Sequence, residues 1–172
     1  MKKIYLVLSQ TYSGVSKTIK IFTKEKYCHA SISLDPKCEE MYSFGRKYRY
    51  FPLLGIFKQE DLNKGLFKNR GALMSMYEIE VSEEQYKGIV SKIEKIKKTN
   101  KGYNIIGLLL AYFRIKLHRN KYYCSEFVYE VLSSKGVDIY DKNKIKFTPM
   151  ELVEKNFKKV YEGEIREFIK TI

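Results

Sequence analysis

The chain has 172 residues, 44% of them hydrophobic and 15% aromatic, and its 33 lysines and arginines against 20 acidic residues give a formal net charge of +13. This composition excludes an intrinsically disordered chain, and the length suits one folding unit, so we expect a single domain over residues 1–172. The positive charge favours weak contact with an anionic surface. It specifies no nucleic acid, because the lysines are scattered along the chain.

Two apolar runs bear on targeting. Ile4–Leu8 is too short for the core of a signal peptide, and Ile105–Phe113 is too short to cross a membrane, so we expect a cytoplasmic protein without a transmembrane segment. The cysteines Cys28, Cys38 and Cys124 form no Cys-x-x-Cys pair and have only two histidines as companions. We therefore expect no disulfide, no metal site and no cofactor.

The first part of the chain predicts strands around one short helix. A buried strand is expected at Ile4–Ser9, followed by a helix with Val15, Ile19 and Phe22 along one face. The next strand, Tyr27–Leu34, alternates between an apolar face and a face of serines with one histidine.

A turn at Asp35-Pro36 then leads to a hairpin partner that ends near Gly45. The segment from Arg46 to Asn69 is aromatic, basic and irregular. We expect a long loop there, which serves as a lid or a binding wall, or only packs.

The second half predicts helices around one further strand. The expected elements are a strand at Ala72–Val81, helices after Ser82, at about Ile105–Lys116, from Cys124 to Gly136 and after Thr148, and a last strand at about Val160–Phe168. Two capping boxes, Ser82 with Gln85 and Thr148 with Glu151, mark helix starts. Together the elements predict an α+β fold in which helices pack on a mostly antiparallel sheet.

Cys124 lies where a helix is expected to begin. The apolar stripe of that helix continues through Phe127, Val128, Val131 and Leu132. The free amides and the dipole of a helix start favour a thiolate, which is the nucleophilic form of cysteine. A small core residue is the plainer interpretation of a lone cysteine on an apolar face.

A nucleophilic cysteine needs a base nearby. His118 lies in a basic stretch at a helix end, where solvent exposure is expected, whereas His29 shares a strand face with Ser31 and Ser33. If the Cys124 helix packs on these small serines, the thiol and the imidazole meet. A hydrogen-bonded structural histidine is the plainer alternative.

Four stretches together resemble one family. "SGVSKTIKIFTKEKYCHASISL", "YSFGRK", "YYCSEFVYEVL" and "FTPMELV" are similar to the helix with the histidine strand, the strand after it, the nucleophile helix and the Thr/Ser-Pro stretch of the YiiX-like amidases. These are the circularly permuted branch of the papain-like NlpC superfamily. The resemblance runs from about Ser13 to Val153 and implies a papain-like fold with the nucleophile at a helix N-terminus.

The resemblance also implies the roles of the residues. Cys124 would be the nucleophile and His29 the general base, and a residue on the strand after the histidine would orient the imidazole. The matching position is Ser43, whose hydroxyl accepts a hydrogen bond more weakly than a carboxylate does. Glu40 is chemically better suited, but strand alternation puts it on the opposite face from Ser43. Both are candidates for the orienting residue.

The expected function is a cysteine hydrolase that cleaves an amide bond in a peptide or cell-wall-type substrate, or in another small acyl-amide, through a thioester acyl-enzyme. One alternative is an acyltransferase or lipid hydrolase of the lecithin–retinol acyltransferase type, for which Ile105–Phe113 and the basic surface suit a lipid interface. The other is a non-catalytic protein that binds a polyanion through its charge and the loop Tyr48–Phe67.

Overall fold

A computed structural model describes residues 1–11, 25–46, 55–99, 124–139, 148–153 and 157–172. The strands are β1 (Lys2–Gln10), β2 (His29–Ser33), β3 (Met41–Arg46), β4 (Gly55–Glu60), β5 (Leu73–Val81) and β6 (Lys158–Glu164). The helices are α2 (Glu83–Thr99), α4 (Cys124–Ser133) and α5 (Ile165–Thr171), with short 3-10 helices η1 (Gly65–Lys68) and η2 (Met150–Val153). The described part is therefore α+β, and none of its helices is long and apolar enough to span a membrane.

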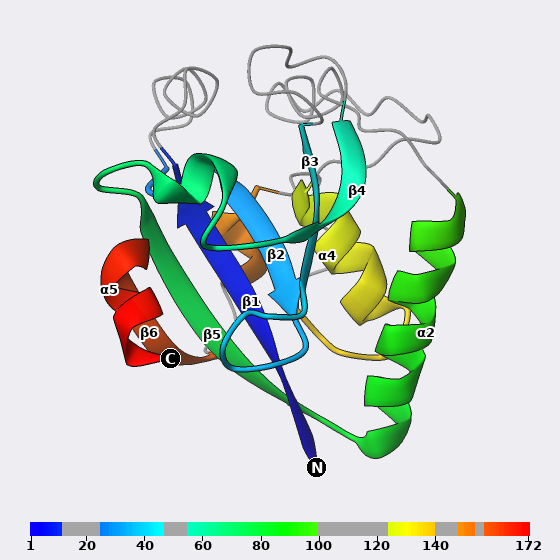
Figure 1. Ribbon diagram of the computed structural model, residues 1–172. Helices are drawn as coiled ribbons and strands as arrows, with labels where there is room; N and C mark the ends of the chain where they lie inside the picture. The colour runs from blue at the N-terminus through cyan, green and yellow to red at the C-terminus, as the bar shows by residue number, and fades with distance from the viewer. Residues whose placement is uncertain (12–24, 47–54, 100–123, 140–147, 154–156) are drawn as a thin grey trace.

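The six strands form one antiparallel sheet in the order β4-β3-β2-β1-β5-β6 (Figure 1). Alternate residues of each strand point to opposite faces, and both faces are buried at the centre of the sheet. One face packs against α2 and α4, and we call it the α4 face; its strand residues include Leu6, Leu8, Ala30, Ile32 and Phe44. The opposite face packs against η1 and α5, and we call it the α5 face; its strand residues include Tyr5, Val7, Met74 and Met76.

The structure confirms the strands expected at Ile4–Ser9 and Ala72–Val81 as β1 and β5, which pair along their whole length. It also confirms the hairpin of β2 and β3 around the turn at Asp35. The carboxylate of Asp35 accepts hydrogen bonds from the amides of Lys37, Glu39 and Glu40, which stabilises this turn.

Helix α2 begins at the expected capping box. The Gln85 amide donates to Ser82 Oγ at 3.0 Å, and the Ser82 amide donates to Gln85 Oε1 at 2.9 Å. Three isoleucines of its apolar stripe, Ile89, Ile93 and Ile96, are buried in the core.

Helix α4 buries its stripe completely, since Phe127, Val128, Val131 and Leu132 are all inaccessible to solvent. After the helix, Gly136 has a φ of 71°. Its amide and that of Val137 bond back to the carbonyls of Ser133 and Leu132, the pattern that closes many helices on a glycine.

Three sequence predictions were wrong. The expected loop from Arg46 to Asn69 contains strand β4 and the 3-10 helix η1. The last strand stops at Glu164 and α5 follows, because Ile165 and Phe168, three residues apart, are both buried on one side of a helix. After Thr148 the described residues form only the short η2; Glu151 accepts the bond from the Thr148 amide, but the Thr148 hydroxyl has no described partner. The helices expected around residues 15–22 and 105–116 lie outside the described residues.

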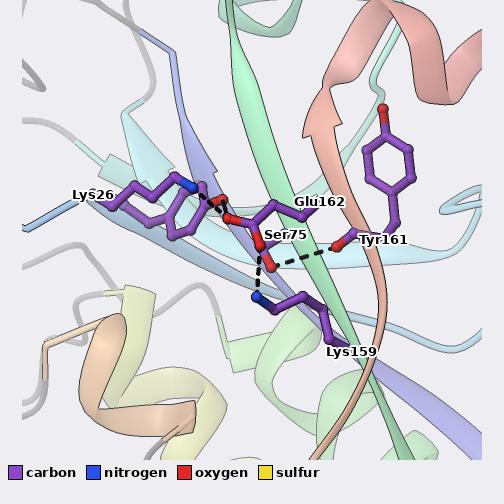
Figure 2. A network of polar contacts seen from close by, with 6 residues as sticks. Lys26, Ser75, Lys159, Tyr161 and Glu162 are labelled. Atoms are coloured by element: carbon purple, nitrogen blue, oxygen red, sulfur yellow. Dashed lines mark hydrogen bonds and ion pairs between the residues drawn. The ribbon is translucent and has the colours of Figure 1, made fainter.

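Strand β6 forms one end of the sheet and is largely exposed. Its ladder with β5 shifts register between Met76 and Tyr77. On this strand Glu162 makes an ion pair with Lys26, accepts a hydrogen bond from the Tyr27 hydroxyl at 3.1 Å, and pairs with Lys159 at 2.5 Å (Figure 2). Glu162 therefore connects Lys26 and Tyr27, which lead into β2, to β6 at the end of the sheet.

We predict that Glu162→Gln lowers the stability of the fold in a pH-dependent way. The hydrogen bonds from Lys159 and Lys26 hold the pKa of Glu162 down, to about 2. A depressed carboxylate pKa stabilises the folded state above the unfolded pKa, and this contribution is lost as the pH falls towards 2. Because Glu162 is partly exposed, we expect a modest loss of about 3 °C in Tm at pH 7 and a smaller loss at pH 3.

Thermal unfolding followed by circular dichroism measures both values, with Glu39→Gln in the exposed turn before β3 as the matched control. An equal loss at the two pH values would show that the ion pairs of Glu162 do not stabilise the fold.

Candidate active site

The site forms where the ladder between β2 and β3 stops. Strand β2 pairs with β1 from Ser33 to His29, but it pairs with β3 only at Ile32 and Ser33. The start of β2 is therefore not covered by β3, and the Ala30 amide there donates a hydrogen bond to the sulfur of Cys124. The described part of α4 begins at this same cysteine.

Helix α4 packs on the α4 face of the sheet, where the rings of Phe127 and Phe44 lie 5.5 Å apart. His29, Ser31 and Ser33 point to the other face. The expectation that the helix lies on the serines was therefore wrong, as was the placing of His29 in mid-strand, because His29 is the first residue of β2. The thiol reaches the imidazole at the end of the strand, where no β3 ladder lies between them.

Cys124 and His29 are joined by a hydrogen bond between their side chains. On the other side of the ring, His29 Nε2 lies 3.1 Å from Oε1 of Glu60, so Nδ1 is the ring nitrogen left for the thiol. The side chains of His29 and Glu60 are 21% and 4% exposed, and Cys124 is 1% exposed. Three residues from β2, β4 and α4 thus form a continuous and largely buried hydrogen-bonded chain.

The carboxylate of Glu60 has two further partners. The hydroxyl of Ser43, on β3, donates to Oε1 at 2.5 Å, and the ammonium of Lys58, on β4, lies 2.9 Å from Oε2. A buried carboxylate is costly unless donors surround it, and here an imidazole, a hydroxyl and an ammonium do so.

The two candidates for the orienting residue fall in different places. Ser43 is buried beside Glu60 and is one hydrogen bond removed from the imidazole. Glu40 precedes β3 and is exposed; its carbonyl accepts a bond from the Leu34 amide, at the end of β2 opposite His29. The residue that contacts the imidazole is Glu60, which the sequence interpretation missed.

Glu60 was missed because its strand was taken for a loop. The stretch "GIFKQE" does alternate: Lys58 and Glu60 share one side, and Phe57 points to the other, where it packs against Phe44 and Phe127. That short alternation is a weak signal for a strand, and the pairing of β4 with β3 puts Glu60 on the same side of the sheet as Ser43.

The charged forms of Cys124, His29 and Glu60 stabilise one another. Burial alone would lower the pKa of His29, but the hydrogen bonds and charges of Cys124 and Glu60 outweigh it and raise the pKa to about 9. Burial likewise raises the pKa of the Cys124 thiol, yet His29 and the amides of Ala30 and Ser125 lower it overall. For Glu60 burial is outweighed by His29, Lys58 and Ser43, and its pKa falls to about 2. The arrangement therefore favours a thiolate beside an imidazolium.

The other two cysteines lack this environment. All three cysteines are buried, and none forms a disulfide. Cys28 donates to Oε1 of Gln10 at 2.6 Å, and burial together with the charge of Asp35 raises the pKa of Cys38 to about 12. No group of three or more His, Cys, Asp or Glu side chains in the described part could hold a metal ion. His118 lies outside that part.

The hydrogen-bonded groups Cys124, His29 and Glu60 can together produce a nucleophilic thiolate, hold a proton on the imidazole and pass that proton to another group. No protein-family model matches the sequence, and no curated protein matches it either.

We predict that the imidazole of His29 titrates with a midpoint near 9 and that Glu60→Gln lowers this midpoint, because the variant removes the negative charge that stabilises the imidazolium. The titration of the imidazole carbon signals by NMR measures both midpoints. The spectrum of His29→Gln assigns the signals, since the chain has only two histidines. An equal midpoint in Glu60→Gln and wild type would contradict the coupling.

Proposed function

We propose that the protein is a cysteine hydrolase that cleaves an amide bond through a thioester acyl-enzyme. The observation that carries the proposal is the hydrogen-bonded chain from Cys124 through His29 to Glu60. In this proposal Cys124 is the nucleophile, His29 is the base and later the acid, and Glu60 orients the imidazole and stabilises its charged form.

The reaction has two halves. The thiolate attacks the carbonyl carbon, a carbon–sulfur bond forms, and the oxygen becomes an oxyanion. The imidazolium then gives its proton to the amide nitrogen, the carbon–nitrogen bond breaks, and the amine leaves. In the second half the neutral imidazole takes a proton from water, the resulting hydroxide attacks the thioester, and the acid and the thiolate are released.

Backbone amides near Cys124 supply the electrostatic part of the proposal. Those of Ala30 and Ser125 already stabilise the sulfur. If Cys124 begins the helix, its own amide is free of intrahelical bonds and stabilises the oxyanion, which in known enzymes is worth about 3 kcal/mol per donor.

The assignment to amide chemistry rests on the resemblance to the YiiX-like amidases, and we propose the permuted papain-like fold on the same grounds. The order of residues agrees with it, because the histidine strand precedes the cysteine helix in the chain, and so does an antiparallel sheet packed against that helix. One departure is clear. The orienting carboxylate lies on β4, two strands after the histidine, and the position on the next strand holds Ser43.

Alkylation of the three thiols by iodoacetamide tests the nucleophile. Because all three cysteines are buried, burial alone gives none of them an advantage. We predict that Cys124 is alkylated at least about tenfold faster than Cys38 at pH 7, since its thiolate is favoured and that of Cys38 is not. His29→Ala removes this preference. Peptide mass spectrometry after timed quenching gives the three rates.

Equal and slow alkylation of the three cysteines would overturn the hydrolase. Ser31→Ala is the matched control for His29→Ala, because Ser31 lies on the same face of the same strand, and it should leave the rates unchanged.

A covalent intermediate identifies the substrate class. We predict that incubation with a panel of N-acyl amides and short peptides adds an acyl mass to the Cys124 peptide, and that hydroxylamine removes it as a thioester. Acylation by phospholipid or acyl-ester donors alone would instead support the acyltransferase or lipid hydrolase. Salt-sensitive polyanion binding that survives Cys124→Ala, with no acylation by any donor, would support the non-catalytic alternative.

A further inference from the structure

A lysine lies at the end of the hydrogen-bonded chain and has no part in the reaction as proposed. Lys58 is on the same side of β4 as Glu60, two residues before it, and its side chain is 37% exposed while that of Glu60 is 4% exposed. Its ammonium contacts Oε2, the oxygen that His29 and Ser43 leave free. Oε1 of the buried carboxylate is therefore held by His29 and Ser43, and Oε2 is held by Lys58.

The neighbouring strand makes room for this lysine. A Cβ atom on Gly45 of β3 would lie 2.8 Å from Cε of Lys58, closer than Cβ atoms approach other atoms, and 3.4 Å from its Nζ. The absence of a side chain on Gly45 thus leaves the space that the end of the Lys58 side chain occupies beside Glu60. Gly45 itself does not have a positive φ, so the open space over it, not its backbone, is what the site uses.

We propose that Lys58 is a positioning residue, which fixes the carboxylate of Glu60 against His29 and sets the pH range in which Cys124 and His29 exist as an ion pair. This inference rests on the proposed function only for its use in catalysis, since the contacts themselves involve no substrate. It adds an electrostatic role to a positional one, because the positive charge of Lys58 also acts on the imidazolium and the thiolate.

The direction of that electrostatic effect is fixed by sign. Lys58 neutralises part of the charge that Glu60 presents to His29, so removing it makes the imidazolium more stable and moves its deprotonation to higher pH. Among the described residues, the titratable groups that face His29 are Glu60 with Lys58 from β4 and Cys124 from α4.

The test measures the titration midpoint of His29 by NMR and the pH profile of Cys124 alkylation by iodoacetamide. In Lys58→Met both the His29 midpoint and the alkaline limb of the alkylation profile should rise by roughly half to one pH unit, a range that allows for the partial exposure of the lysine. Lys58→Arg should restore the wild-type values, because it keeps the charge. Lys64→Met is the control: Lys64 pairs with Asp61 on the exposed turn after β4, and both readouts should stay unchanged.

Gly45→Ala provides a second route that keeps the lysine. The three atoms nearest to the added methyl group are Cε and Nζ of the flexible Lys58 side chain and Oε1 of Glu60, so it displaces the ammonium with little cost to the fold. We expect a smaller shift in the same direction. A merely structural role would lower Tm in both variants without moving the His29 midpoint.

The outcomes separate the two proposals. If Cys124 is unreactive in the wild type but the His29 midpoint rises in Lys58→Met, the hydrolase fails and the role of Lys58 stands. If Cys124 is reactive but neither variant moves either readout, the role of Lys58 fails and the hydrolase stands. A lowered midpoint in Lys58→Met would also overturn the inference.

Discussion

The site depends on a short ladder. Because β2 and β3 pair at only two positions, the first residues of β2 keep an edge that is open on the side of β3, and the Ala30 amide there bonds to Cys124 instead of to a strand. A longer ladder would satisfy that amide and would put β3 between the thiol and the imidazole. Because α4 packs on one face of the sheet and the side chain of His29 belongs to the other, Cys124 and His29 can meet only where the sheet is interrupted in this way.

From this meeting point four groups that can carry alternating charges follow one another in a row: the thiol of Cys124 on α4, the imidazole of His29 on β2, and the carboxylate of Glu60 and the ammonium of Lys58 on β4. Each inner member is compensated by its neighbours, which is why Glu60 can remain ionised where it is almost fully buried. The cost of burial is thus shared along the row, and removal of any one member leaves the next without its partner. The exposed end of the row is Lys58, where solvent screens the remaining charge.

Much of the fold could be predicted from periodicity. The strands β1 and β5, the stripe of α4 with its closing glycine and the capping box of α2 follow local rules, and the sequence states them directly. Three features could not be predicted. The place where Cys124 meets His29 depends on where the ladder between β2 and β3 ends, which is a tertiary property of β3 and not a pattern in β2. Glu60 lies in a short strand within an aromatic and basic segment, where the apolar and polar residues alternate over too few positions to outweigh the irregular residues around them. The C-terminal residues illustrate a third case, because the buried pair Ile165 and Phe168 fits a helix as well as a strand until the docking of α5 beside η1 decides it.

Strand β6 has a consequence for the protein as a whole. A strand at the end of a sheet offers unpaired amides and carbonyls on which another chain can add. Here that strand begins with Lys158 and Lys159, and its ladder is displaced by the register shift opposite Met76 and Tyr77. A second molecule that approached in antiparallel fashion would meet an irregular, charged border instead of a flat apolar one, and two chains of net charge +13 also repel each other. These features of β6 therefore disfavour the addition of a second copy at this edge.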